Sequence, residues 1–203
     1  TTLLSKDQLP QSILELTQPQ WKGKFAMAYP LFGTTASHAA ALFHVLGESR
    51  AKQFFDDLQK NEVNIADGNA MVKEWVVDGV VPLGLTDTDD ACLAKFQGKP
   101  VDFYFPDQQE GGMGTLFIPN TVSLIRGAPH PQTAQRFIDF LLSAEVETLL
   151  ANSEAKQIPL RKEVLPPPEM PSRSQLKILQ ATFDEIATKL EITDSYLQKK
   201  FAK

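Results

Sequence analysis

The chain has 203 residues, of which 42% are hydrophobic and 22% are charged, and its formal net charge is −5. These values predict a globular protein with a buried core, and the acidic balance disfavours nucleic-acid binding, which normally requires a basic face. The sequence has no apolar run of the roughly 20 residues that cross a bilayer, and its single cysteine, Cys92, excludes an intrachain disulfide. We therefore expect no nucleic-acid partner and no direct membrane insertion.

Strand and helix patterns alternate through the first half of the chain. Ser5 is a suitable N-cap for a short helix through Leu16. Beyond it, apolar runs predict strands at 25–28, 63–66, 80–85 and 101–105. Helical periodicity predicts a helix that ends near 46, a second that begins at 48 and has apolar positions through 58, and helices at 69–78 and 91–96. Because strands and helices alternate, we predict an α/β fold with a parallel sheet and helices on both of its faces.

The pattern changes after the glycine-rich run at 111–114. Segments 115–118 and 121–125 are rich in β-forming residues, and Pro131 is a suitable first residue for a helix. That helix, 131–142, has an apolar face formed by Ala134, Phe137, Ile138, Leu141 and Leu142. A continuing helical segment at 145–151, a stiff run of three prolines at 166–168 and a last helical region at 174–201 follow.

Three loops that follow predicted strands and enter helices carry candidate ligand-binding residues. These residues are Gly33, Thr34 and Thr35 in the first loop, Asn69 in the second and Asp87 in the third. The carboxyl ends of parallel strands meet at one edge of a sheet, and the free N–H groups of helix starts attract anions. The same residue types are also the most favourable helix N-caps, so both interpretations remain open.

Asp87, Asp89 and Asp90 place three carboxylates within four residues. Carboxylate oxygens suit hard cations, so the trio is a candidate metal site, with Asp89 and Asp90 as its ligands. Aspartate is also favoured in the first turn of a helix, where the helix dipole stabilises it. His38 and His44 do not have the i, i+4 spacing of a ligand pair, and we interpret Cys92 as a packing residue.

Several motifs carry a family resemblance: WKGK at 21–24, PLFGTT at 30–35, DGNA at 67–70 and VPLGL at 81–85, followed by the helix at 131–142. With these motifs in this order, the chain resembles bacterial ferric-iron-binding proteins, which are extracellular solute-binding proteins of ABC transporters. The resemblance covers about residues 10–165.

The resemblance implies a type II periplasmic binding fold, whose lobes are three-layer αβα units with a mixed, mainly parallel sheet. Residues 1–118 correspond to the second lobe, 119–158 to a hinge strand and helices that normally complete the first lobe, and 159–203 to helices that return to the second lobe. Most of the first lobe is then expected to be missing. Without it, the apolar face at 134–142 is expected to pack on the remaining lobe or on a second copy of the chain.

The resemblance also implies a function without catalysis. A periplasmic or otherwise extracytoplasmic protein of this kind delivers its ligand to an ABC permease. Its interlobe cleft holds a metal ion, ferric iron or another hard cation, together with a phosphate-like or carbonate-like anion, or an anionic solute. The anion position matches Gly33, Thr34, Thr35 and Asn69. The family's paired tyrosine ligands are replaced here by Asp89 and Asp90, which puts ferric iron in doubt.

Two other functions are compatible with parts of the sequence. The stretch Asp87-Thr88-Asp89 after a strand resembles the start of magnesium-dependent haloacid-dehalogenase-like phosphatases, but no convincing downstream acidic pair accompanies it. An effector-binding lobe of a transcription regulator shares the two-lobed fold, but the sequence has no visible helix-turn-helix.

Overall fold

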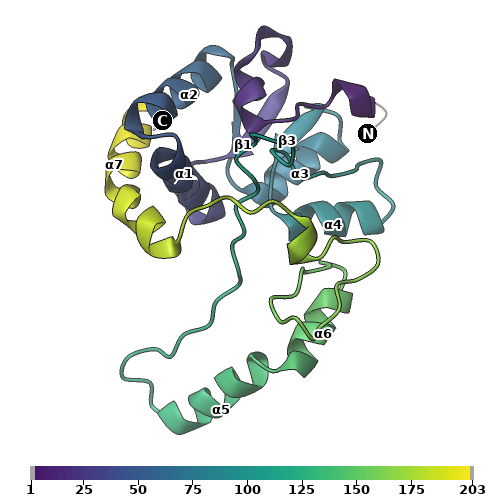
Figure 1. The fold of residues 1–203 in the computed structure, drawn as a ribbon, viewed down its shortest axis with the longest axis vertical. Coiled ribbons are helices and arrows are strands. Elements are labelled where there is room, and N and C mark those ends of the chain that lie inside the picture. Colours follow the sequence, from purple (N-terminus) through teal and green to yellow (C-terminus); the bar gives the residue numbers. More distant parts are fainter. Residues whose placement is uncertain (1–2, 202–203) are drawn as a thin grey trace.

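A short parallel sheet forms the centre of the molecule. The computed structural model describes residues 3–201. Among them, the sheet consists of β1 (Phe25–Ala28), β2 (Asn64–Ala66) and β3 (Leu83–Leu85), in the order β2-β1-β3 and all parallel (Figure 1). Each of these strands lies within or beside a segment that the sequence predicts as a strand.

The central strand β1 is buried on both faces, and its alternating side chains separate two apolar clusters. Phe25 and Met27 join the cluster formed with α1 (Gly33–Val45) and α2 (Glu48–Lys60). Ala26 and Ala28 join the cluster formed with α3 (Asn69–Val77). Because successive strand residues point to opposite faces, this division confirms the predicted three-layer arrangement with helices on both sides of the sheet.

The C-terminal helix α7 (Phe183–Phe201) packs along α1, far from it in sequence. Leu197 is fully buried in the main core, and the rings of Tyr196 and Phe43 lie 6.0 Å apart. At its end, the hydroxyl of Tyr29 donates a hydrogen bond of 2.8 Å to the backbone oxygen of Phe201. These contacts join residues beyond 183 to the same body as the sheet.

The predicted strands at 101–105, 115–118 and 121–125 are not formed. In the part of the chain that the structure describes, these segments are irregular, and one isolated parallel bridge joins Thr115 to Ile178. The sheet is therefore wholly parallel, whereas a mixed sheet was expected. A strand needs a neighbour for its backbone N–H and C=O groups, and β-forming composition cannot supply one.

Both ends of the chain also differ from the sequence-based prediction. The expected helix at 5–16 is divided at Pro10 into two short 3-10 helices, η1 (Lys6–Gln8) and η2 (Ile13–Thr17). A third, η3 (Pro19–Trp21), follows them. The last helix begins at Phe183 rather than near 174, where only η4 (Arg173–Gln175) forms. Proline lacks a backbone N–H, which accounts for the first interruption.

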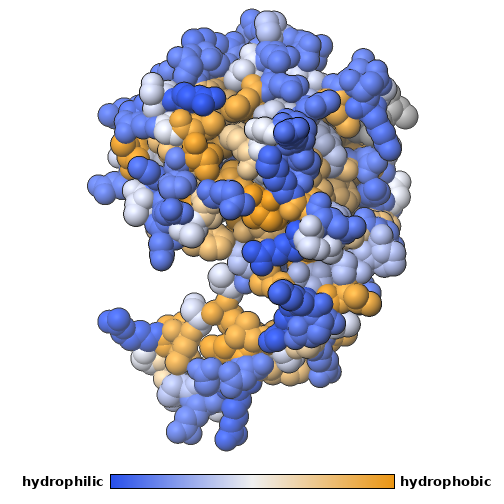
Figure 2. Space-filling view, in the orientation of Figure 1, coloured by the Kyte–Doolittle hydropathy of each residue, from blue (hydrophilic) through white to orange (hydrophobic). Residues whose placement is uncertain are grey.

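Helices α5 (Pro131–Leu141) and α6 (Ala144–Asn152) lie apart from the sheet, at the end of a long extended segment (Figure 1). None of the α5 side chains is buried, and Phe137 and Leu142 are 60% and 56% exposed. Figure 2 shows that apolar side chains of this part gather toward the hollow that separates it from the rest. The expected packing of this face on the remaining lobe is therefore wrong for this chain.

Candidate functional site

The three predicted loops meet at the carboxyl edge of the sheet. Gly33 begins α1 with a φ of 58°, a left-handed conformation that glycine adopts without strain. The first backbone bond of this helix runs from the N–H of Ala36 to the oxygen of Phe32 (3.1 Å). The N–H groups of Gly33, Thr34 and Thr35 precede that bond, so they are available for an anion.

The second helix start contributes an amide side chain. Asn69 is the first residue of α3, and the first backbone bond of that helix runs from the N–H of Met71 to the oxygen of Gly68 (3.1 Å). The side-chain nitrogen of Asn69 donates 2.9 Å to the hydroxyl oxygen of Thr34. The hydroxyl of Thr35 in turn donates to the side-chain oxygen of Asn69 at 3.4 Å.

Asp87 joins both helix starts from the third loop. Its carboxylate accepts the hydroxyl of Thr34, at 2.9 Å to Oδ1 and 3.1 Å to Oδ2, and its Oδ2 also accepts the amide of Asn69 at 2.5 Å. Asp87 is the N-cap residue of α4 (Thr88–Phe96), but its side chain makes no capping hydrogen bond. The carboxylate is thus turned away from its own helix and toward the other two.

This network brings together Thr34, Thr35, Asn69 and Asp87, with Gly33 beside them. Thr34 was expected to bind an anion, but its hydroxyl proton is already donated to Asp87. Its hydroxyl is therefore not free to donate to a ligand. Thr86 also contacts this network, because its hydroxyl donates a hydrogen bond of 3.2 Å to the backbone oxygen of Asn69, and it was not among the residues predicted from the sequence. Its only signal was its position between a strand and the aspartate trio.

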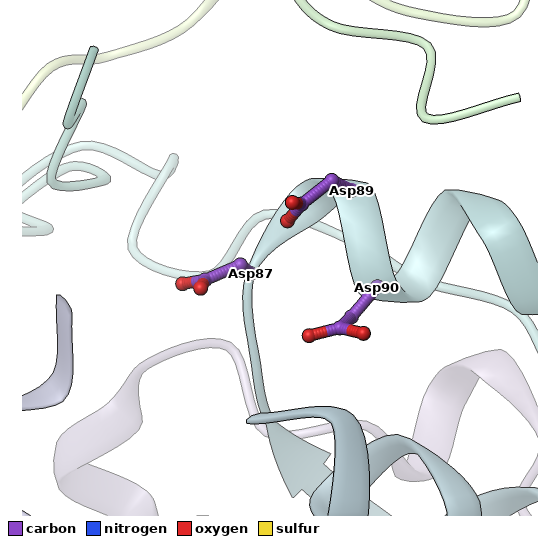
Figure 3. A group of neighbouring side chains, drawn as sticks. All are labelled: Asp87, Asp89 and Asp90. Atoms are coloured by element: carbon purple, nitrogen blue, oxygen red, sulfur yellow. The ribbon is translucent and has the colours of Figure 1, made fainter. Parts of the chain in front are cut away.

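Asp89 and Asp90 lie in the first turn of α4 rather than in a loop before it, because α4 begins at Thr88 and not near 91. Figure 3 shows that Asp87, Asp89 and Asp90 extend from the start of this helix toward the same side. One oxygen from each lies within 4.8 Å of the others. Their donor set fits a hard cation, and it equally fits the favourable placement of aspartate at a helix start.

The electrostatic surroundings of Asp90 differ from those of Asp89, which is exposed. Burial, followed by the neighbouring Asp89 carboxylate, raises the pKa of Asp90 above its ordinary value. The Nζ of Lys73, on α3, lies 3.9 Å from an Asp90 oxygen and opposes this rise. Lys73 was not identified from the sequence, since nothing in its pattern places it beside the trio.

A large cleft of about 1870 Å³ adjoins these groups. Its walls include Thr34, Asn69 and Asp87 on one side and Leu142 and Val146 on another. His38, one turn along α1 from Thr34, also lines it. Burial lowers the pKa of His38 to about 4, against the attraction of the buried Asp107 carboxylate. His38 is therefore neutral at pH 7.

Cys92 is buried on α4, where its thiol contacts the sulfur of Met170 at 3.5 Å. Burial raises the pKa of this thiol to about 11, so it remains protonated at neutral pH. This agrees with the packing role expected from the sequence.

Residues 1–178 match the family described as bacterial extracellular solute-binding protein. The chain belongs to this family. Among its relatives, a putative 2-aminoethylphosphonate-binding periplasmic protein of Salmonella typhi is 27% identical over 165 residues, which are 79% of this chain and 48% of the relative. The chain spans about half the length of the curated relatives it matches.

Solved structures of the family's type II periplasmic binding fold superpose on nearly the whole chain. Iron-bound HitA from Pseudomonas aeruginosa matches with a TM-score of 0.80 at 22% identity, covering 98% of this chain and 63% of HitA. AfuA from Actinobacillus pleuropneumoniae, with fructose-6-phosphate bound, matches with a TM-score of 0.81 at 24% identity, covering 96% and 61%. These matches confirm the α/β fold class predicted from the order of strands and helices, and the type II periplasmic binding fold that the resemblance implied.

Proposed function

We propose that this chain is part of the solute-binding component of an ABC importer and that it acts by binding rather than by catalysis. Family membership supports this role. The protein would work outside the cytoplasm and deliver its ligand to an ABC permease. Among the described residues, no helix is both long and apolar enough to cross a bilayer.

The ligand that the site supports best is a solute with a tetrahedral oxyanion. The observation that carries this proposal is the convergence of the α1 and α3 starts beside Asp87, on one wall of the cleft. Backbone N–H groups of Gly33 and Thr35 would bind the anionic oxygens, while Thr34 and Asn69 hold the rim of the site in place. The name of the 27%-identical relative, a phosphonate-binding protein, supports the same ligand class.

A second candidate is a hard cation bound by Asp87, Asp89 and Asp90, with phosphate or carbonate as a companion anion. The mutual proximity of their oxygens, within 4.8 Å, favours it. The 3.9 Å approach of Lys73 to Asp90 weakens it, because a bound cation would have to share the carboxylate with an ammonium group. The absence of the paired tyrosines from the matching positions also makes ferric iron the less favoured cation.

The phosphatase alternative gains no support from these relatives, which are a putative 2-aminoethylphosphonate-binding periplasmic protein and iron-bound HitA. We also propose the lobe division that the resemblance implies, with 1–118 and 159–203 in one lobe and 119–158 in the other. The separation of α5 and α6 from the sheet supports it (Figure 1). The hydrogen bonds from the N–H groups of Leu160 and Arg161 to Glu147 place the first residues of 159–203 beside α6, so these residues do not fit the proposed boundary.

Isothermal titration of the chain with methylphosphonate, inorganic phosphate, Mn²⁺, Ca²⁺ and chelated Fe³⁺ tests the two ligands against each other. We expect heat from the phosphonate and phosphate without added metal, and a loss of that heat in Asn69→Ala. Binding of a cation alone, abolished by Asp89→Ala, would favour the metal site instead. If none of these ligands binds, the proposed function is wrong.

A further inference from the structure

The carboxylate of Asp87 poses a problem for an anion site, because it places a negative charge at the rim where the anionic ligand has to bind. The side-chain donors nearest to it are already committed. Thr34 donates to Asp87, Asn69 donates to both Thr34 and Asp87, and Thr35 donates to Asn69. These bonds fix the position of the carboxylate and leave it facing the cleft that it lines.

We propose that Asp87 is a specificity-determining residue that accepts a hydrogen bond from a protonated oxygen of the ligand, and that the site thereby selects phosphonates and phosphates over sulfonates and sulfate. The inference rests on the proposed oxyanion-binding function. It names the property that the bound anion must have: at least one O–H group beside its anionic oxygens.

The hydrogen-bonding capacity of the site supports this selection. A carboxylate offers about four lone-pair directions and no donor. The single hydroxyl proton of Thr34 is shared, with its shorter contact to Oδ1, and Asn69 donates to Oδ2, so each carboxylate oxygen has about one principal donor. The carboxylate therefore has room for a further donor, and a donor is what a P–O–H group supplies. Such a bond to an ionised acceptor is about twice as strong as one between neutral groups.

An anion without a proton meets the same carboxylate differently. A sulfonate or sulfate has acceptor oxygens only, so its oxygen opposite Asp87 would face a like charge with no hydrogen between them. Lys73 lies 2.9 Å from Glu74 and 3.9 Å from Asp90, so its charge is already paired with these two carboxylates. Phosphate monoesters have a second pKa of about 6, so a large share of them keeps one O–H near that pH.

Asp87 can be replaced without removing a capping bond from α4. It is the N-cap residue of α4, yet its side chain makes no capping bond, and asparagine and serine are equally favourable at such a position. Asp87→Asn and Asp87→Ser are therefore expected to fold. Asp67→Asn is the matched control. Asp67 is an exposed carboxylate two residues before Asn69, and its replacement changes the net charge by the same amount as Asp87→Asn.

The test compares methylphosphonate with methanesulfonate. Both have three oxygens on a tetrahedral centre, but only the methylphosphonate monoanion carries an O–H group. Their affinities for the 203-residue chain are measured by titration calorimetry at about pH 6. We expect wild type and Asp67→Asn to prefer methylphosphonate by about tenfold or more, as one hydrogen bond to a charged group supplies. In Asp87→Asn and Asp87→Ser, we expect the preference to fall to about threefold or less, chiefly through tighter sulfonate binding.

The possible failures are distinct. Equal affinity for the two anions in wild type, or a preference that both Asp87 variants retain, would overturn the role of Asp87 while leaving an oxyanion site in place. If neither anion binds wild type or any variant, although the circular dichroism spectra show folded protein, the oxyanion site itself is wrong and this inference is wrong with it.

Discussion

Gly84 of β3 faces Val72 of α3 at a distance that leaves no space for a side chain. A Cβ built on Gly84 would lie 2.5 Å from Cγ1 of Val72 and 3.1 Å from Cγ2 of Val76. Val72 is fully buried, and its helix carries Asn69 at its first turn. The close approach of this helix to the sheet therefore sets where Asn69 lies relative to Asp87, which follows β3.

Gly84→Ala is expected to destabilise the protein by about 1–3 kcal/mol, because the added methyl group overpacks this contact. Adding Val72→Ala should recover part of the loss, since it removes the clashing methyl groups, and urea unfolding of both variants measures the recovery. Gly68→Ala is the control: Gly68 is extended, and its Cβ would meet nothing within 4 Å. If the losses in free energy of unfolding from the two substitutions simply add in the double variant, the overpacking between positions 84 and 72 is not the cause of the destabilisation.

Thr34→Val keeps the size of the side chain and removes its hydroxyl, which bonds to both Asp87 and Asn69. We expect phosphate or methylphosphonate affinity to fall by about three- to tenfold, as expected for the loss of about 1 kcal/mol of hydrogen bonding. Titration calorimetry measures the change. Thr17→Val, in η2, makes the same substitution where the hydroxyl bonds to Leu14, and its affinity should equal that of wild type. Unchanged binding in Thr34→Val would argue against the network.

His38 predicts an acid-dependent loss of stability. Its pKa is lowered from 6.5 to about 4 by burial, so the unfolded chain binds a proton that the folded chain does not between these values. The stabilisation is complete above about pH 6.5 and is lost as the pH falls toward 4, by roughly 1–3 kcal/mol. Urea unfolding from pH 7 to 4.5 measures it.

Two variants make this pH prediction specific. His38→Gln should flatten the decline, since glutamine does not titrate. His130→Gln, at an exposed position just before α5, should retain the decline of wild type. Identical pH profiles for the His38 variant and wild type would show that other groups cause the acid sensitivity.

The apolar face of α5 predicts self-association of this chain in isolation. Phe137 and Phe140 are 60% and 50% exposed, and burial of each such ring is favourable by about 1.5–3 kcal/mol. Sedimentation velocity from about 1 to 100 μM should show a mass that rises with concentration, and Phe137→Ser with Phe140→Ser should reduce the rise. Gln132→Ser, on the same helix, is the control. A constant monomer mass across this range would count against self-association.

The sequence by itself determined the layers of the sheet region and the approximate starts of α1, α2 and α3. The buried run at 25–28 and the helical periodicity of the segments that end near 46, begin at 48 and begin at 69 are local signals, and the structure contains each of these elements. The order of strands and helices then required parallel strands whose carboxyl ends share one edge. Thr34, Asn69 and Asp87 could be grouped for this reason alone, although no spacing rule relates them.

Only the tertiary structure decided how these groups use their hydrogen bonds and where the second half of the chain lies. The bond from Thr34 to Asp87 depends on side-chain directions that residue types do not specify. Segments 101–105, 115–118 and 121–125 have β-forming composition, but a strand exists only where a neighbouring backbone can pair with it. Likewise, the periodicity of α5 identifies its apolar face but cannot say what covers that face, because burial depends on contacts with other parts of a fold.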